Sequence, residues 1–268
     1  MPSNMITAEE LAHKAEKVDP EEFLQLVRDV TKRLREGQEQ TRNLKIRGRL
    51  VTFPPMEEAI IVGDLHGDLK SLMYILGNSG FLEKVQDGVN ASMIFLGDYG
   101  DRGIHSPEVY YVVLKLKEVF PENVLLMRGN HEGPADLLAQ PHDLPIHLRR
   151  KFGEEASRMY VHLRELFDYL HTAALVEGRF ILLHGGAPSQ AASLEDLAYA
   201  HEKHPQESHL EEILWSDPWE GMVGTSFSPR GAGRLFGEDV TDRLLRICHA
   251  KILIRGHEPS PELSLIHI

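Results

Sequence analysis

The chain has 268 residues, of which 42% are hydrophobic, and its formal net charge is −12 with a pI near 5.7. This length suits one α/β domain with a substantial core better than two small ones, and the acidic balance argues against nucleic acid as the main partner, because non-specific binding to nucleic acid depends on positive charge. No apolar run approaches the roughly 20 residues that span a membrane and no secretory pattern opens the sequence, so we expect a soluble, cytoplasmic protein without a membrane partner.

Two helices are expected before Gly37. Thr7 with Glu10, and Asp19 with Glu22, form capping-box patterns at the start of each. The second helix would then present one apolar face, formed by Phe23, Leu24, Val27, Val30 and Leu34. Such a face usually packs on its own domain, although a helix that docks a partner protein has the same pattern. We favour packing on the domain.

Five short aliphatic runs follow, and each ends abruptly in glycine with a charged or imidazole side chain. They are Ala59–Val62 before GDLHG, Met93–Leu96 before GDYGDRG, Val124–Met127 before RGNHE, Phe180–Leu183 before HGG and Ile252–Ile254 before RGHE. Runs this short indicate strands. Helix-like segments separate the first three, at Asp68–Leu76 and at Pro107–Val119 behind a Ser106 cap. The pattern predicts βαβ units whose functional loops lie at the carboxyl ends of the strands.

Two later segments have a structural interpretation. The segment His201–His209 (HEKHPQESH) has several histidines, but its charge and its proline favour a solvated loop or helix start over a metal site. An amphipathic helix is expected over Asp239–His249. It contains Cys248, the single cysteine of the chain, which excludes an intramolecular disulfide and is interpreted as a reduced structural thiol.

The strand-end loops together offer carboxylate, amide and imidazole groups without a thiolate. Such a set suits divalent ions such as manganese, iron, zinc or magnesium, and two ions about 4 Å apart, bridged by a carboxylate, would use it fully. Each residue alone has an ordinary interpretation as a turn cap or a core histidine, but five coincident strand ends favour a site. We assign Asp98 to the bridge, Asp64 and His66 to one ion, and Asn130, His184 and His257 to the other. Manganese is the first expectation for the two divalent ions, with iron or zinc as alternatives.

The ordered motifs also resemble a known family. GDLHG, GDYGDRG, RGNHE, HGG, SDP (Ser216–Pro218), RGAGRLFG (Arg230–Gly237) and RGHE occur in this order over roughly Ile60–Pro259. They resemble the phosphoprotein phosphatases, the Ser/Thr phosphatase branch of the calcineurin-like metallophosphoesterases. The resemblance implies an α/β fold with two mixed β-sheets in a sandwich flanked by helices. We expect a single domain over residues 1–268, with a helical extension over 1–50 and a catalytic core over 58–260.

The resemblance also implies roles for four further residues. His131 would protonate the leaving alkoxide, Asp101 would orient His131, and Arg102 and Arg230 would bind the phosphoryl group. The predicted activity is metal-dependent hydrolysis of phosphoserine and phosphothreonine monoesters in proteins by a bridging water that the metals activate. A phosphoprotein is the expected substrate, and the sequence specifies no regulatory subunit. Arg128 and Arg255 precede ligand loops, but we leave both outside the site, because such arginines more often neutralise or cap.

Two features depart from the family pattern. Gly100 stands where the family usually has valine, and glycine there is expected to loosen the loop between Asp98 and Asp101. Family members also continue well past RGHE, whereas this sequence closes on SLIHI, which resembles nothing expected there. We therefore expect the last strands of the fold to be missing, as in a truncated reading frame, and favour this over a variant that fills its last strand differently.

Two other functions are considered. A phosphodiesterase or dinucleoside tetraphosphate hydrolase of the same superfamily predicts aspartate where Glu132 stands, and it gives no reason for SDP and RGAGRLFG. A non-catalytic binding module with this fold would tend to lose metal ligands or the acid, and here His131 and every expected ligand are present. The phosphatase is favoured over both.

Overall fold

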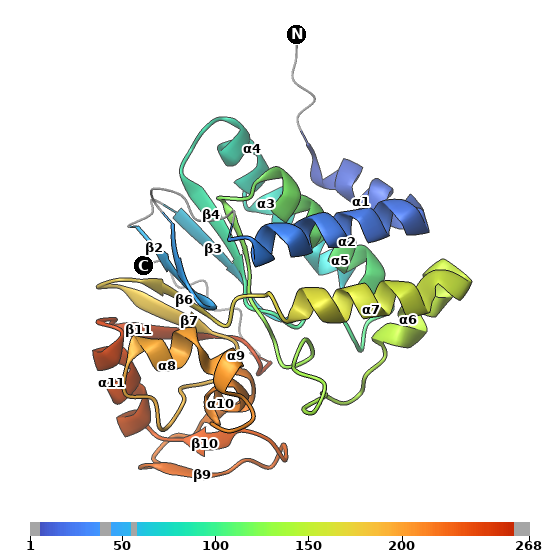
Figure 1. Ribbon diagram of the computed structural model, residues 1–268. Coiled ribbons are helices and arrows are strands. Elements are labelled where there is room, and N and C mark those ends of the chain that lie inside the picture. Colours follow the sequence, from blue (N-terminus) through green and yellow to red (C-terminus); the bar gives the residue numbers. More distant parts are fainter. Residues whose placement is uncertain (1–5, 38–43, 55–57, 260–268) are drawn as a thin grey trace.

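The computed structural model describes residues 6–37, 44–54 and 58–259, and two facing β-sheets form its centre (Figure 1). The larger sheet is mixed and has the order β1-β2-β6-β7-β11. Its strands are β1 (Lys45–Arg47), β2 (Leu50–Phe53), β6 (Ala173–Val176), β7 (Phe180–Leu183) and β11 (Ile252–Arg255). The smaller sheet is parallel and contains β3 (Glu58–Val62), β4 (Ala91–Phe95) and β5 (Val124–Leu126) in that order.

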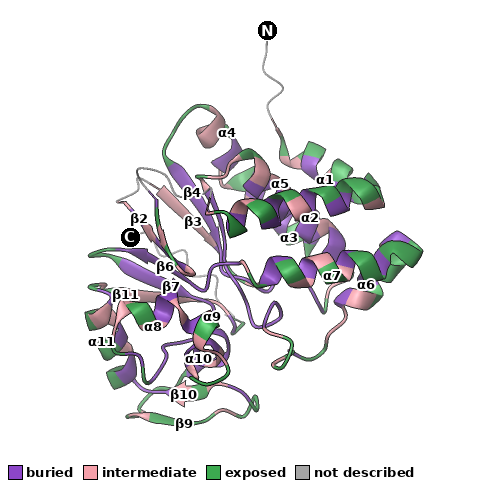
Figure 2. Ribbon diagram, in the orientation of Figure 1, coloured by how far each residue is buried: buried purple, intermediate pink, exposed green. Residues whose placement is uncertain are grey.

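Alternating side chains of the two sheets form the central core. One face of β4 and β5 contributes Ile94 and Leu125, which pack in the same buried cluster as Val51 of β2 and Leu182 of β7. Because successive side chains of a strand point to opposite faces, the neighbours of these residues are left to face the outer helices. The central strands of the two sheets are accordingly buried: every residue of β4, β5, β6 and β7 is buried, whereas β3 and β11 at the edges are mainly of intermediate exposure (Figure 2).

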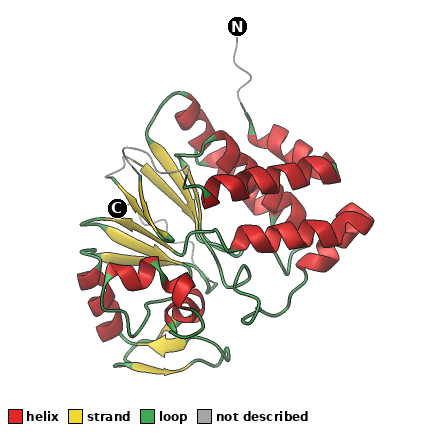
Figure 3. Ribbon diagram, in the orientation of Figure 1, coloured by secondary structure: helices red, strands yellow, loops and turns green. Residues whose placement is uncertain are grey.

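Seven helices and one 3₁₀ turn lie on the outer side of the smaller sheet (Figure 3). They are α1 (Ala8–Lys17), α2 (Pro20–Arg35), α3 (Leu69–Asn78), α4 (Phe81–Gln86), α5 (Ser106–Val119), α6 (Leu144–Phe152), η1 (Gly153–Glu155) and α7 (Ala156–Phe167). Met93 and Phe95 of β4 contribute to the apolar core on this side. The predicted helices at 68–76 and 107–119 are confirmed as α3 and α5, with one correction. The N-cap of α5 is His105, so Ser106 is its first helical residue rather than its cap.

Four helices of the described chain lie on the outer side of the larger sheet. They are α8 (Leu194–Ala198), α9 (Ala200–Lys203), α10 (His209–Trp215) and α11 (Glu238–Ile247). A third, small sheet with the order β8-β10-β9 lies beside them, formed by β8 (Asp217–Pro218), β9 (Thr225–Phe227) and β10 (Arg234–Phe236). This small sheet was not predicted. Cys248 is buried in the core on this side, and burial raises the pKa of its thiol to about 12, which supports a structural role.

The N-terminal helices pack on the domain as the apolar face predicted. Phe23 and Val27 of α2 are fully buried in the core that also contains Tyr111 of α5. The Thr7 capping box is present at the start of α1. At the start of α2 the Asp19 side chain accepts from the Glu22 backbone, but the Glu22 side chain does not return the bond, because it accepts from the Tyr111 hydroxyl at 2.8 Å. The predicted extension over residues 1–50 also contains β1 and the start of β2, which belong to the larger sheet.

All five predicted strands are present, within two residues of their expected limits, as β3, β4, β5, β7 and β11. Within the described residues β11 pairs only with β7 and forms one edge of the larger sheet. The closing SLIHI lies outside the described residues. In the described part of the chain, no helix combines the length and apolar character that a membrane span requires.

Candidate metal centre and active site

The loops after the five predicted strands meet at one edge of the two sheets. Backbone hydrogen bonds join them: His66 N donates to Asp98 O at 2.9 Å, and Gly256 N donates to His184 O at 3.0 Å. The parallel strands β3, β4 and β5 end at the same edge, and so do the parallel strands β7 and β11. This topology gathers the predicted site residues from segments far apart in the sequence.

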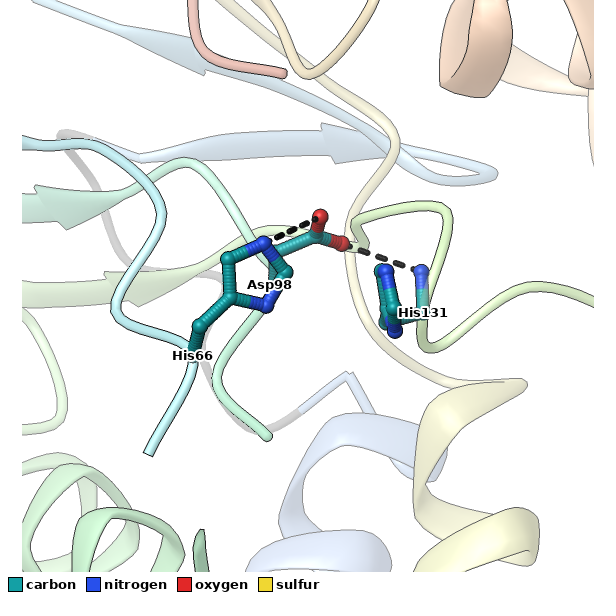
Figure 4. A group of neighbouring side chains, drawn as sticks. All are labelled: His66, Asp98 and His131. Carbon is teal, nitrogen blue, oxygen red and sulfur yellow. Dashed lines mark hydrogen bonds and ion pairs between the residues drawn. The ribbon is translucent and has the colours of Figure 1, made fainter. Parts of the chain in front are cut away.

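Asp98 lies at the centre of the gathered side chains. Its Oδ2 is 3.6 Å from Nε2 of His66, and its Oδ1 is 3.5 Å from Nε2 of His184. The backbone N–H of His131 donates to Oδ1 at 3.0 Å, and Figure 4 shows the Asp98 carboxylate between His66 and His131. Each carboxylate oxygen therefore faces a different imidazole, which is the geometry that a bridging ligand requires.

Two groups of donor atoms share Asp98. His66, Asp98 and His131 form one, and Asp98, His184 and His257 form the other. Asp64 adjoins both, since its Oδ2 is 3.9 Å from His66 Nε2 and its Oδ1 accepts a hydrogen bond from the His257 backbone at 3.0 Å. The structure thus brings the predicted ligands together, and their assignment to metal ions stays a prediction.

The imidazole rings are oriented for binding a cation. Nδ1 of His66 is 3.0 Å from the carbonyl oxygen of Gly100, and Nδ1 of His184 is 3.0 Å from that of Leu96. A backbone carbonyl accepts a hydrogen bond, so Nδ1 carries the proton and the Nε2 lone pair faces Asp98. Nε2 of His257 is buried and has no hydrogen-bond partner among the residues that the structure describes. Such an arrangement fits metal ligation.

The charge balance of the site also fits cations. Burial lowers the pKa of His66 and His184, and burial with the nearby His184 ring lowers the pKa of His257 to about 2, so the rings are neutral. Burial raises the pKa of Asp98 well above its ordinary value, and the carboxylates of Glu132 and Asp64 add to this effect. Neutral imidazoles and crowded buried carboxylates are stabilised together by a divalent ion.

The Asn130 side-chain amide has two alternative orientations. The end that faces the centre lies 2.9 Å and 3.1 Å from the Asp98 carboxylate oxygens and 3.2 Å from Nε2 of His184. Hydrogen bonding alone favours the amide nitrogen at this end, because nitrogen can donate to the carboxylate. A cation bound between these groups would favour the oxygen instead.

Backbone strain is concentrated in the same loops. Among the described residues other than glycine, six have a positive φ, between 43° and 69°. Five of them belong to the predicted site: His66, Asp98, Asp101, Arg102 and His257. Residues with a side chain rarely adopt this left-handed conformation, and where it persists it often marks a functional site.

His131 and Asp101 form a buried dyad beside the donor atoms. Nδ1 of His131 is 2.6 Å from Oδ2 of Asp101, and the Leu144 backbone N–H donates to Oδ1 at 2.6 Å. Burial alone would raise the pKa of Asp101, but hydrogen bonds from His131 and His142 outweigh it and hold that pKa below its ordinary value. Asp101 therefore stays ionised and fixes the imidazole of His131.

The two predicted phosphate-binding arginines differ in how they are held. Arg102 is exposed and has no hydrogen bond or ion pair with any residue that the structure describes. Arg230 is fixed, because its Nε lies 2.5 Å from Oδ2 of Asp217.

Arg255, which we left outside the site, binds the other oxygen of Asp217 at 2.6 Å and so contacts the residue that anchors Arg230. Arg128 hydrogen-bonds to the Glu132 carbonyl and the Asp168 carboxylate, as expected of an arginine that neutralises and caps.

Glu132 is a positioning residue that the sequence analysis missed. Its carboxylate is fully buried and accepts hydrogen bonds from the backbone N–H groups of Asp98 at 2.7 Å, Tyr99 at 3.0 Å and Gly129 at 3.2 Å. It also accepts from the Tyr110 hydroxyl at 2.7 Å. Glu132 therefore holds the loop that carries the bridging candidate. The sequence contained one signal of this role: a charged residue, Glu132, directly follows His131 in the loop after a strand.

Gly100 has a packing role that the sequence did not predict. A Cβ atom at Gly100 would lie 2.9 Å from a ring carbon of Tyr110 and 3.2 Å from its hydroxyl, whereas the φ angle of Gly100 does not require glycine. The missing side chain thus makes room for Tyr110, which binds Glu132. This finding adds a packing role to the expected loosening of the loop, which stays a prediction.

Gly100→Val is expected to destabilise the chain by about 1 to 3 kcal/mol, the usual cost of overpacking. The measurement is urea unfolding of Gly100→Val, of Tyr110→Leu and of the double variant. Because the clash needs the tyrosine ring, Gly100→Val should cost much less in the Tyr110→Leu background. An equal cost in the two backgrounds would contradict the packing explanation.

The segment His201–His209 forms α9, a turn and the start of α10, in agreement with the predicted helix start. Two of its residues, Glu207 and His209, could suggest a metal site together with Asp196, because donor atoms of the three lie within 4.8 Å of one another. However, the ammonium of Lys203 is 2.8 Å from Asp196 and 3.2 Å from Glu207 and already neutralises both carboxylates. We assign no metal to this group.

Comparisons with known proteins agree with the fold and the donor set. The family model described as calcineurin-like phosphoesterase matches residues 59–261. The chain therefore belongs to the calcineurin-like phosphoesterase family. Its order of strands, its paired sheets and the strand-end loops with carboxylate and imidazole donors are consistent with this membership.

Among the relatives are serine/threonine-protein phosphatases. The serine/threonine-protein phosphatase 4 catalytic subunit of Kluyveromyces lactis is 34% identical over 200 residues, and that of Saccharomyces cerevisiae is 33% identical over 200 residues. Each match covers 74% of this chain but 61% of the relative, so the chain spans less than two thirds of their length. A solved serine/threonine phosphatase from Saccharomyces cerevisiae superposes with a TM-score of 0.69 at 25% identity, over 91% of this chain and 72% of the other.

Proposed function

We propose that the chain hydrolyses phosphate monoesters of serine and threonine in proteins. The observation that carries this proposal is the central position of Asp98, with His66 on one carboxylate oxygen, His184 on the other and the His131–Asp101 dyad beside it. A two-metal site next to a histidine held by an aspartate suits hydrolysis of a phosphoester. The names of the relatives support serine/threonine phosphoproteins as the substrate class.

The metal ligands are proposed as two sets that share Asp98. Asp64 and His66 would hold one ion, and Asn130, His184 and His257 the other, with manganese first and iron or zinc as alternatives. Two divalent ions held in this way supply Lewis acidity and lower the pKa of a coordinated water. The buried Nε2 of His257, which lacks a hydrogen-bond partner in the described part of the chain, and the neutral rings of His66 and His184 support this assignment.

The remaining site residues act on the phosphoryl and leaving groups. His131 would donate a proton from Nε2 to the departing alkoxide, while Asp101 keeps Nδ1 protonated and the ring in place. Arg230, anchored by Asp217, offers planar donors to phosphoryl oxygens, and Arg102 can swing to the same group because nothing in the described chain holds it.

Domain organisation and location belong to the same proposal. We place the catalytic core at residues 58–260 of one domain, with α1 and α2 packed on it from the N-terminal extension. A cytoplasmic location is consistent with the single buried cysteine.

The test is turnover by the purified chain with manganese, iron or zinc. Phosphoserine and phosphothreonine peptides are compared with an aryl phosphodiester and a dinucleoside tetraphosphate, and Asp98→Asn serves as the control that lacks the bridging carboxylate. Release of phosphate from the peptides is expected to be faster than cleavage of the aryl diester or of the tetraphosphate anhydride. Faster cleavage of either of these two substrates would favour the phosphodiesterase or dinucleoside tetraphosphate hydrolase, and metal binding without any turnover would favour the binding module.

A further inference from the structure

Asp101 binds a second imidazole besides that of His131. Nδ1 of His142 lies 3.2 Å from Oδ2 of Asp101, the same oxygen that Nδ1 of His131 approaches at 2.6 Å. On its other side, Nε2 of His142 lies 2.8 Å from the hydroxyl of Tyr160 on α7. The side chains of Asp101 and His142 are only 2% and 13% exposed, so water competes little for these contacts.

Ionised Asp101 only accepts, so Nδ1 of His131 and Nδ1 of His142 both carry protons and donate to its carboxylate. The direction of the contact between Nε2 of His142 and the Tyr160 hydroxyl follows the ring: Nε2 accepts from the hydroxyl in the neutral tautomer and donates to its oxygen in the doubly protonated ring. In both forms Tyr160 holds the far side of the His142 ring while Nδ1–H binds Asp101.

These contacts restrain Asp101 from two directions. The Leu144 N–H at the start of α6 binds Oδ1, and His142 binds Oδ2. Asp101 has a strained positive φ of 62°, so its side chain depends on such partners to keep one orientation. Tyr160 belongs to a helix of the outer layer and gives His142 a rigid support.

We propose that His142 and Tyr160 are positioning residues, which hold Asp101 and through it the His131 ring in the orientation for protonating the leaving group. The proposal rests on the proposed function of His131. It assigns the loop before α6 and the helix α7 a part in the reaction, although neither carries a predicted site residue. Outer partners of site residues are typically worth on the order of 10 to 100 fold in activity.

The kinetic test compares His142→Ala, His142→Asn and Tyr160→Phe. His142→Ala is expected to lower kcat on a phosphoserine peptide by about 10 fold, with KM nearly unchanged, and to lower kcat on an aryl phosphate much less, because an aryl leaving group needs little protonation. His142→Asn keeps an N–H near the position of Nδ1 and should restore most of the loss. Tyr160→Phe, which keeps the ring, should give an intermediate loss.

His147→Asn is the matched control. His147 lies on α6 near His142 and is also buried, but its Nδ1 contacts the Ser106 hydroxyl at 3.0 Å instead of Asp101. Its replacement should change the two substrates equally. The proposal is overturned if His142→Ala also affects both substrates equally, or if His142→Asn is as impaired as His142→Ala, since packing alone would then explain the loss.

A second readout does not depend on turnover. In histidine-labelled protein, ring protons hydrogen-bonded to a carboxylate give NMR signals far downfield, and we expect one each from Nδ1 of His131 and His142. His142→Ala should remove one signal and shift the other, and Tyr160→Phe should shift both. An unmoved His131 signal in both variants would overturn the proposal. Absence of turnover in the unsubstituted chain would contradict the proposed function and leave this NMR test intact.

Discussion

His131→Asn is expected to lower kcat on a phosphoserine peptide by about 10² to 10⁴ fold, the usual contribution of a general acid. The physical reason is the leaving group. A serine alkoxide is a strong base that must be protonated as the P–O bond breaks, and Nε2 of His131 is the atom left free for this when Nδ1 binds Asp101. An aryl phosphate releases a weakly basic phenolate, so the same variant should lose much less on that substrate.

Steady-state kinetics of both substrates measure this difference. His105→Asn is a suitable control, because His105 is the N-cap of α5 in the segment that also carries Asp101, but its side chain is 52% exposed. It should retain nearly full activity on both substrates. Equal losses on the peptide and on the aryl phosphate in His131→Asn would remove His131 from the acid role.

Arg102→Ala and Arg230→Ala should each lower the rate by about 10² to 10³ fold, as expected for donors aimed at developing phosphoryl charge. Neither side chain is among the donor groups that adjoin Asp98, so the content of bound metal should stay unchanged. The hydrolysis rate of a further variant, Asp217→Asn, separates the roles of the two arginines. Asp217→Asn should weaken the action of Arg230, which it anchors, and leave that of Arg102 intact.

Arg234→Ala provides the comparison for both arginines. Arg234 belongs to the same RGAGRLFG motif, but its side chain is 45% exposed and approaches Glu212 at 3.7 Å rather than the site. Kinetics and metal analysis of the three variants together are required. Loss of bound metal in Arg102→Ala or Arg230→Ala would identify that arginine as structural, and a comparable rate loss in Arg234→Ala would show that the effect is not specific.

The sequence predicted which side chains would gather at this edge, because each lies in the loop that follows a strand. Their role as metal ligands stays a prediction. His66, Asp98 and His184 stand at the ends of short aliphatic runs, and parallel strands carry such ends to one edge of a sheet. The local pattern of a strand, a glycine and a donor is visible without knowing the tertiary structure. The three-dimensional arrangement then brings these predicted residues within a few ångström of Asp98.

The supporting residues could not be predicted in this way. His142 reaches Asp101 across 41 residues, and the anchor Asp217 joins Arg230 and Arg255 across 13 and 38 residues. These contacts follow from how loops and helices pack, which no local periodicity encodes. The packing role of Gly100 was missed for the same reason, because the ring of Tyr110 that needs its space comes from α5.

Several strands were missed because their local signals are weak. β6 has the sequence AALV, in which alanine has a low strand preference, and its place between β2 and β7 depends on the sheet around it. β8, β9 and β10 have only two or three residues each, too few for an alternating pattern. The strand order of the mixed larger sheet and the small third sheet could be recognised only from the structure. The βαβ units of the smaller sheet could be predicted from the sequence.

The most direct test of the two-metal account is metal content measured together with turnover. The purified chain loaded with manganese should bind two ions, lose phosphoserine peptide hydrolysis on exhaustive chelation, and regain it when manganese, iron or zinc returns. Asp98→Asn should bind fewer ions and stay inactive, since both proposed ligand sets use this carboxylate. Full hydrolysis by a chain stripped of metal would contradict the account.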